Sequence, residues 1–264
     1  MGQTSEHADG NIKRSETATA KRAEAGEAAN GSPEAAAEDH LEAGATVDPT
    51  QESAAADRLQ SAAAVLDWRL QTFALYAEVR AAAAASPAKA HILWRERRDA
   101  MFADHPASAL NPLRKETFTG LPVAPYDPAF RFECGLTTEG AGQEMTISTG
   151  TDGAVPFVRL GALEIPGIGA LAAWKLNSYG GGIFIPFRDT TAGQDGGSYG
   201  AGRYLLDTIK GAYLGRAGNH FIVDFNFAYN PSCAYDEAWA CPLPGPDNRL
   251  GTAVTVGEMY SPID

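Results

Sequence analysis

Apolar residues recur at helical spacing directly after residue 57. Six of them follow one another at three- and four-residue steps, namely Leu59, Ala63, Leu66, Leu70, Phe73 and Tyr76. This spacing predicts an amphipathic helix over Arg58–Ala84, because such steps place residues on one helix face. A second helix is predicted to begin at Ser86-Pro87, since serine is a favoured N-cap and proline a favoured first helical residue. It should end before His105-Pro106.

Beyond Pro112 the pattern changes to an alternation with period two, which is typical of strands. Eight strands are predicted: Thr117–Leu121, Phe130–Leu136, Glu144–Ser148, Val155–Leu160, Ala170–Leu176, Ile183–Phe187, Tyr199–Leu206 and Phe221–Phe227. They are separated by turns rich in Gly, Asp and Pro, with no room for helical crossovers, so the sheet should be antiparallel. The predicted fold is α+β and mainly β: an N-terminal helical pair packed on an antiparallel β-barrel or sandwich.

Composition divides the chain into two parts. Residues 1–57 contain 12 of the 33 acidic residues but only 4 of the 21 basic ones, and the first aromatic residue is Trp68. A segment this poor in apolar side chains cannot offset the entropy lost on ordering. We therefore expect a disordered acidic Ala/Glu-rich tail at 1–57 and a single globular domain at 58–264, helical over 58–105 and mainly β over 113–264.

Charge and hydropathy exclude several classes of partner. The sequence has no basic run suited to phosphates, so we expect no nucleic-acid partner. It also has neither an apolar signal region nor a stretch of about 18–20 apolar residues, which argues against a membrane partner. A cytoplasmic location is the resulting expectation. Oligomeric state and cofactor remain unassigned.

Polar residues at strand ends form the candidate site. Arg188, Asp189, Thr190 and Thr191 follow an apolar strand and precede a glycine-rich loop, a favourable position for ligand contacts. Arg203 is suited to bind an anionic group of a small molecule bidentately. The remaining candidates are hydrogen-bonding residues of the next strand end, namely Asp224, Asn226 and Asn230. The function expected from them is small-molecule binding or catalysis.

A competing interpretation uses the same residues. They are also suited to a buried polar network that fixes loop geometry in a structural or protein-interaction module.

Two short motifs offer little further support for an enzyme. Gly167–Ala172 matches a dinucleotide fingerprint, and Gly196–Gly200 matches a serine nucleophile elbow followed by Asp207 and His220, but neither precedes a predicted helix.

Two cysteines lie in an unusual segment rich in proline and aromatic residues, Asp224–Asn248. Cys233 and Cys241 are eight residues apart, wider than the spacing of zinc knuckles, so we assign no metal site. The alternatives are a metal site completed by His220 or Asp224, and a catalytic thiol with His220 or His105 as base. We expect both thiols, like Cys134, to be reduced, and Cys233 and Cys241 to be largely buried and inert.

The order of short motifs resembles the bacterial and archaeal family called domain of unknown function 1684. The matching stretches are Trp94–Asp99, His105-Pro106, Phe118–Leu121, Pro125–Pro128, Phe184–Thr190, Gly193, Tyr199–Leu205, Asp224–Pro231, Cys233–Tyr235, Cys241-Pro242, Asn248–Leu250 and Gly257-Glu258. The resemblance covers about residues 60–261. It implies no activity, because the family has none established. Relatives tend to carry threonine where Ser198 stands, which weakens the serine-nucleophile interpretation.

Overall fold

A computed structural model describes residues 49–149 and 153–260. It contains three α-helices in this part of the chain: α1 (Pro49–Ala83), α2 (Pro87–Asp104) and α3 (Pro112–Thr117). Most of the predicted tail lies outside the described residues. Helix α1 nevertheless begins at Pro49, earlier than the predicted Arg58, because Ala-rich residues 53–56 are strong helix formers.

The first turn of α2 follows the predicted capping pattern. The Ser86 side chain accepts a hydrogen bond from the Lys89 backbone N–H at 3.4 Å, and Pro87 occupies the first helical turn. The same pattern recurs at Asn111, whose side chain accepts from Arg114 N at 2.9 Å and begins α3. The strand predicted at Thr117–Leu121 is therefore wrong, since the residues that lead into it form a capped helix.

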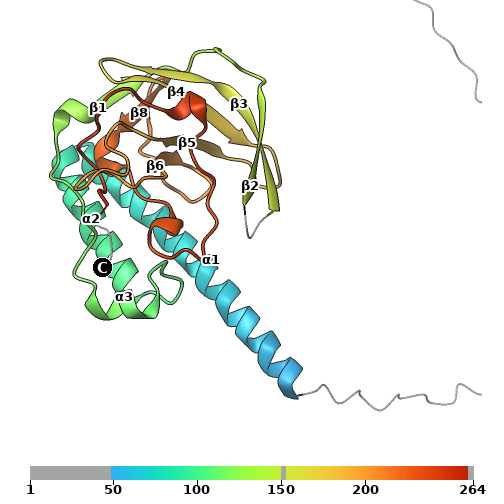
Figure 1. Ribbon diagram of the computed structural model, residues 1–264. Coiled ribbons are helices and arrows are strands. Elements are labelled where there is room, and N and C mark those ends of the chain that lie inside the picture. Colours follow the sequence, from blue (N-terminus) through green and yellow to red (C-terminus); the bar gives the residue numbers. More distant parts are fainter. Residues whose placement is uncertain (1–48, 150–152, 261–264) are drawn as a thin grey trace, which may run out of the picture. The chain divides into compact units, whose positions relative to one another are not determined.

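The face that α1 buries agrees with the predicted one only at Tyr76, which is buried. Leu59, Leu66 and Leu70 are 72%, 58% and 58% exposed, whereas Leu75 and Val79 are almost fully buried. The reason is visible in Figure 1, where the N-terminal part of α1 extends beyond the sheets and only its C-terminal part packs beside α2. Position along the helix, rather than periodicity alone, decides which apolar residues are covered.

The strands form two antiparallel sheets, so the α+β prediction with an N-terminal helical pair is confirmed. A five-stranded sheet has the order β2-β3-β4-β5-β6, and a three-stranded sheet has the order β1-β8-β7. The bounds are β1 Arg131–Cys134, β2 Glu144–Thr149, β3 Gly153–Ile165, β4 Gly169–Leu176, β5 Ile183–Phe187, β6 Arg203–Asp207, β7 Arg216–Ala217 and β8 His220–Asp224. The predicted strand at Phe221–Phe227 stops at Asp224, whose side chain caps a 3-10 turn at Phe225–Phe227.

Both sheets contribute to one apolar core. Leu163 of β3, Phe187 of β5 and Val223 of β8 are almost fully buried in the same cluster. Two isolated antiparallel bridges join the five-stranded sheet to segments that follow β1 and β8, Leu163 to Leu136 and Tyr204 to Tyr229. The Tyr204–Tyr229 bridge brings β6 beside the segment that follows β8.

The helical pair packs against this segment. Trp94 of α2 donates from Nε1 to the Tyr76 hydroxyl of α1 at 3.1 Å, and its ring meets Phe227 edge-on at 5.4 Å.

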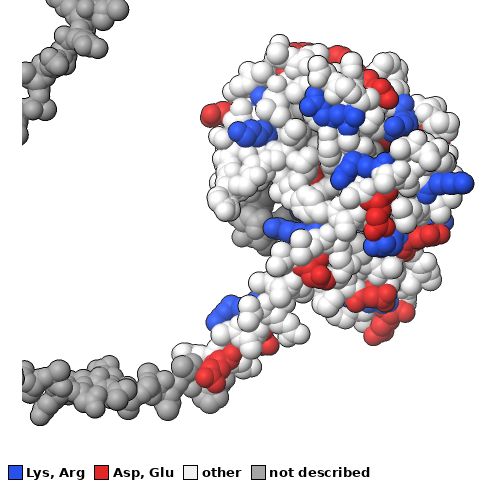
Figure 2. Space-filling view, turned by 180° about the vertical axis from the view of Figure 1, so that it is seen from behind, with Lys and Arg blue, Asp and Glu red and all other residues white. Residues whose placement is uncertain are grey.

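Basic and acidic side chains intermingle on the molecular face seen in Figure 2. None of the helices in the described part of the chain is both long enough and apolar enough to cross a membrane.

Candidate small-molecule site

The predicted site residue Arg203 lies at the centre of a buried network. Its side chain is fully buried, with Nη1 donating to Val256 O at 2.5 Å and Nη2 to Val254 O at 2.8 Å. The Asp189 carboxylate is 3.6 Å from Nη2. Burial lowers the pKa of Arg203, while Asp189 opposes that shift. The guanidinium thus holds the C-terminal stretch against β6.

Asp189 is saturated with hydrogen bonds. It accepts from Ser198 Oγ at 2.5 Å, from Thr191 Oγ1 at 2.7 Å and from Val254 N at 2.8 Å. Burial raises the pKa of Asp189, but the charge of Arg203 and these bonds prevail and lower it overall. Ser198 therefore has an aspartate as its partner and no helix after it, so the structure does not assemble a nucleophile elbow there.

Asp224 and Asn226 form a second internal pair. Asp224 Oδ1 accepts from Asn226 Nδ2 at 2.8 Å, and Asn226 Oδ1 accepts from Asp127 N at 2.8 Å. Burial raises the pKa of Asp224, against the opposing effect of its bonds to Asn226 and of Arg131. The structure thus places these two residues in loop-fixing contacts.

Within the predicted strand-end loop, Arg188 is held through its backbone. Arg188 N donates to Asn248 O at 2.9 Å and Arg188 O accepts from Leu250 N at 2.8 Å, while the Thr190 side chain is exposed. None of Arg188, Asp189, Thr190, Arg203, Asp224 and Asn226 lines the cavity described next. Asn230 is the one predicted residue that lines the cavity described next.

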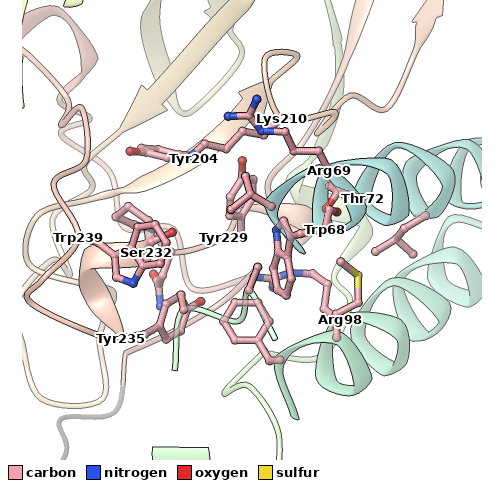
Figure 3. Close-up of a pocket in the computed structure, with 18 of the residues that line it drawn as sticks. Trp68, Arg69, Thr72, Arg98, Tyr204, Lys210, Tyr229, Ser232, Tyr235 and Trp239 are labelled. Atoms are coloured by element: carbon pink, nitrogen blue, oxygen red, sulfur yellow. The ribbon is translucent and has the colours of Figure 1, made fainter. Parts of the chain in front are cut away.

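A cavity of about 180 Å³ lies between the helical pair and the segment 229–239 (Figure 3). Its lining is mostly aromatic and apolar, with a few polar groups. The lining residues are Val65, Trp68, Arg69, Thr72, Leu75, Tyr76, Arg98, Met101, Phe102, Ala107, Ala109, Tyr204, Lys210, Tyr229, Asn230, Pro231, Ser232, Tyr235 and Trp239. Such a concave, aromatic surface with few polar groups is typical of small-molecule sites.

Arg98 is the main polar residue of the cavity wall, although it is not among the site residues predicted from the sequence. The side chain is 9% exposed, and its guanidinium lies 4.6 Å from the Trp94 ring centroid and 5.3 Å from that of Phe102. Trp94, Arg98 and Phe102 follow one another at four-residue steps and share one face of α2. That spacing was the available signal for burial of Arg98 beside the two rings.

The buried carboxylate of Glu258 holds Arg98 and Asn230 together. Its Oε2 accepts from Arg98 Nη2 at 2.9 Å and from Asn230 N at 3.2 Å, while its Oε1 accepts from the Tyr235 hydroxyl. Burial lowers the pKa of Arg98, but Glu258 more than offsets this and the pKa is raised overall. Burial and the neighbouring Glu258 charge raise the pKa of Tyr235. Arg98 is therefore a permanent cation and Tyr235 a neutral donor.

Two buried polar atoms of this cluster have no hydrogen-bond partner among the described residues. They are Nη1 of Arg98 and Oδ1 of Asn230. The Asn230 amide is oriented by its Nδ2, which donates to Met259 O at 2.9 Å. Leaving such groups unpaired costs about 1–3 kcal/mol each. Both atoms are inaccessible to solvent, so neither opens into the cavity.

The rim of the cavity carries exposed lining residues. Arg69 and Lys210 are exposed cations, and Trp239 is 42% exposed. The labelled side chains in Figure 3 place Trp68 and Arg69 of α1 opposite Trp239 and Tyr235. The charged residues of the described lining are Arg69, Arg98 and Lys210, and all three are basic.

The two cysteines of the Pro-rich segment flank Trp239 in the sequence. Both are free thiols but only half-buried, so the expectation that they are largely buried is wrong, whereas Cys134 is buried. Cys233 N donates to Cys241 Sγ at 3.4 Å. The hydrogen bond from the Cys233 thiol lowers the pKa of Cys241 and outweighs the opposing effect of burial. This direction is opposite to the one expected for an inert thiol. The same pairing raises the pKa of Cys233.

The two alternatives for the cysteines were a metal site and a catalytic thiol with a histidine base. The histidines that these alternatives require lie in other contacts or on the surface. His105 Nε2 lies 3.0 Å from Asp67 Oδ2 and its Nδ1 accepts from Ala107 N, so it is occupied at the end of α2. His220 is exposed on β8. Within residues 49–149 and 153–260, no group of three or more His, Cys, Asp or Glu is arranged to hold a metal ion.

Comparison with known proteins identifies relatives without naming an activity. A family model described as "Protein of unknown function (DUF1684)" matches residues 116–259. A solution NMR structure of an uncharacterised protein from Haloarcula marismortui is 32% identical, covering 63% of this chain and 90% of that one, with a TM-score of 0.47. No match is found among curated proteins. Asn230, Tyr235 and Glu258 lie within the matched residues, whereas Trp68 and Arg98 precede them.

Proposed function

Because the chain belongs to the DUF1684 family, whose name assigns no activity, we propose its function from the cavity, as a small-molecule-binding protein. The observation that carries this proposal is the concave cavity of about 180 Å³, which is lined mostly by aromatic and apolar side chains and has the buried cation Arg98 in its wall. A bound molecule would cover the surrounding rings.

The energetics favour binding over an empty cavity. Burial of aromatic surface contributes roughly 25 cal/mol per Å², and each newly made hydrogen bond about 0.5–1.5 kcal/mol. The wall is also preorganised, because Glu258 fixes Arg98 and the Asn230 backbone while Met259 O fixes the Asn230 amide. A ligand would therefore have little side-chain entropy to remove on binding.

A second function rests on the network around Arg203. This side chain binds the backbone of residues 254–258 and pairs with Asp189, so the predicted cluster also suits a scaffold that fixes loop geometry. In that alternative the family would act as a structural or protein-interaction module, and no ligand would be needed.

A thermal-shift screen with a metabolite library tests the proposal. A ligand at a hundredfold excess over its Kd adds about 2.7 kcal/mol, which raises Tm by about 5–10 °C in a domain of this size. Trp239→Ala should reduce the shift because Trp239 lines the cavity. Tyr179→Ala is the matched control, since Tyr179 is fully exposed and lies outside the lining.

The screen can also reject the proposal. If no compound raises Tm, or if Trp239→Ala and Tyr179→Ala retain the shift equally, the cavity is not a binding site and the scaffold function is favoured.

A further inference from the structure

The two thiols of the Pro-rich segment, Cys233 and Cys241, are neighbours in space. Cys241 Sγ accepts a hydrogen bond from Cys233 N at 3.4 Å and another from the Cys233 thiol. The Tyr199 hydroxyl lies 3.2 Å from Cys233 O and 3.8 Å from Cys233 Sγ. Both cysteines are only half-buried, so a small oxidant can reach them. Two adjacent, accessible thiols are suited to oxidation to one disulfide.

The two sulfurs differ in their protonation. The hydrogen bond from Cys233 lowers the pKa of Cys241 to about 6 against the effect of burial, and the charge of Lys210 contributes. Cys241 is therefore mostly thiolate at pH 7, and the thiolate is the form that reacts with oxidants. The hydrogen bond to Cys241 and burial raise the pKa of Cys233. At neutral pH the pair thus holds one thiolate, on Cys241, and one proton, on Cys233.

The pair adjoins the cavity wall. The chain between the two cysteines carries Tyr235 and Trp239, which both line the cavity (Figure 3). The Tyr204 ring lines it as well, and the Tyr204 hydroxyl donates to the carbonyl of Pro242, the residue after Cys241, at 2.7 Å. A disulfide here would close a short covalent ring that includes part of the wall.

We propose that Cys233 and Cys241 are a peroxide-sensitive pair that forms a reversible disulfide, with Cys241 as the attacking and Cys233 as the resolving sulfur, and that this bond restrains the wall segment bearing Tyr235 and Trp239. The proposal does not depend on whether the cavity binds a molecule.

The reaction has two steps. In the first, the Cys241 thiolate attacks one oxygen of hydrogen peroxide, so an S–O bond forms, the O–O bond breaks and hydroxide leaves. In the second, Cys233 attacks the resulting sulfenic acid, so the S–S bond forms, the S–O bond breaks and water leaves with the proton of Cys233. The two sulfurs lose two electrons, which reduce one peroxide to water and hydroxide.

The first step prepares the second. Sulfenic acid is neutral, so oxidation of Cys241 removes the negative charge that raises the pKa of Cys233. The hydrogen bond from the Tyr199 hydroxyl acts in the opposite direction and lowers that pKa, which favours the Cys233 thiolate. Cys233 is therefore protonated while Cys241 attacks, and becomes easier to deprotonate when it must attack in turn.

Mass spectrometry of the reduced full-length protein after treatment with hydrogen peroxide at pH 7 tests the pair. The mass should fall by two hydrogens and recover with dithiothreitol. Digestion after Glu237, which lies between the two cysteines, should yield two peptides that remain joined. Cys134→Ser is the matched control, because Cys134 is buried and should take no part. No joined peptides, or a bond to Cys134 or between two chains, would overturn the proposal.

Cys233→Ser tests the division of roles. Serine keeps a hydroxyl donor beside Cys241 but cannot form the disulfide, so the sulfenic acid should persist and take up roughly tenfold more dimedone than wild-type protein does. Equal dimedone labelling of both proteins would reject Cys233 as the resolving sulfur. Should Cys233→Ser not fold, the joined peptides of wild-type protein still decide whether the disulfide forms.

Proteolysis of the folded protein tests the effect on the wall. Glu237 is exposed in the segment between the cysteines, and cleavage there requires that segment to open locally. Oxidised wild-type protein should be cut after Glu237 about threefold or more slowly than reduced protein, because the disulfide opposes this opening. An equal rate in the two forms would reject the restraint of the wall.

Discussion

Glu258 and Arg98 form a buried ion pair at 2.9 Å across 160 positions of the sequence, with side chains 0% and 9% exposed. The pair joins α2 to the C-terminal stretch and supports the inner wall of the cavity. Breaking a buried pair leaves an uncompensated charge in the protein interior. When an exposed pair is broken, water solvates the charge that remains.

Glu258→Gln should lower the free energy of unfolding by about 3–5 kcal/mol, because Arg98 would then be a buried cation without a partner. Urea denaturation measures this change. The same molecule offers the control, since Arg97 and Glu78 pair at 3.0 Å with side chains 46% and 45% exposed. Glu78→Gln should cost no more than about 0.5 kcal/mol. Similar small losses in both variants would contradict the structural role of the buried pair.

His91 should make stability fall in mild acid. It is buried against Trp94 and Phe227, and burial lowers its pKa from 6.5 to about 4. The unfolded chain then binds the proton first, so the free energy of unfolding decreases as pH falls from 6.5 towards 4. Below pH 4 the contribution of His91 to this loss stays constant. At pH 5 the loss amounts to about 2 kcal/mol.

Denaturation of wild-type protein and His91→Phe at pH 7.5 and pH 5 measures this contribution. The difference in unfolding free energy between the two pH values should be smaller in His91→Phe by about 2 kcal/mol. An unchanged pH dependence would show that His91 is not held neutral by burial.

Cys241 should be the most reactive thiol of the protein. Its pKa is lowered to about 6, mainly through the hydrogen bond from Cys233, so it is mostly thiolate at pH 7. Burial raises the pKa of Cys134. Mass spectrometry after brief iodoacetamide treatment should find label on Cys241 first, with a rate that levels off above about pH 7.

The Cys233→Ala variant provides the counterpart for this labelling experiment. Alanine removes the donor that lowers the pKa of Cys241, so the pH profile of Cys241 labelling should move towards higher pH. Faster labelling of Cys134 than of Cys241 would contradict the assignment.

Arg203→Lys should destabilise the protein without abolishing ligand binding at the cavity. Lysine keeps the charge near Asp189 but cannot donate to several carbonyls in the fixed geometry of a guanidinium. A loss of about 1–3 kcal/mol in unfolding free energy is expected, with the ligand-induced rise in Tm retained. Loss of the ligand effect at unchanged stability would instead return the binding site to the cluster around Arg203.

The main elements follow from local signals in the sequence. Ser86-Pro87 begins α2 as predicted, and the period-two stretches form β2 to β5. Helix α3 was missed although Asn111-Pro112 carries the same type of signal as Ser86-Pro87. The prediction there followed the period-two pattern beyond Pro112 and made no use of the cap.

The candidate site was less predictable, because its parts come from distant segments. Asn230 was identified from its strand end, and Arg98 had a detectable signal in its spacing from Trp94 and Phe102. Nothing near Glu258 in the sequence marks it as buried, since its partners lie in α2 and in the segment after β8. Pairings of that range depend on the packed fold and not on local pattern.

The long sequence separation of the cavity walls has a kinetic consequence. Contacts between residues 98 and 258 close a very long loop, and such contacts generally form late in folding. A molecule bound there would interact with the native state but hardly with the folding transition state. It should therefore slow unfolding while leaving the rate of folding almost unchanged, so that occupancy prolongs the lifetime of the finished protein without assisting its formation.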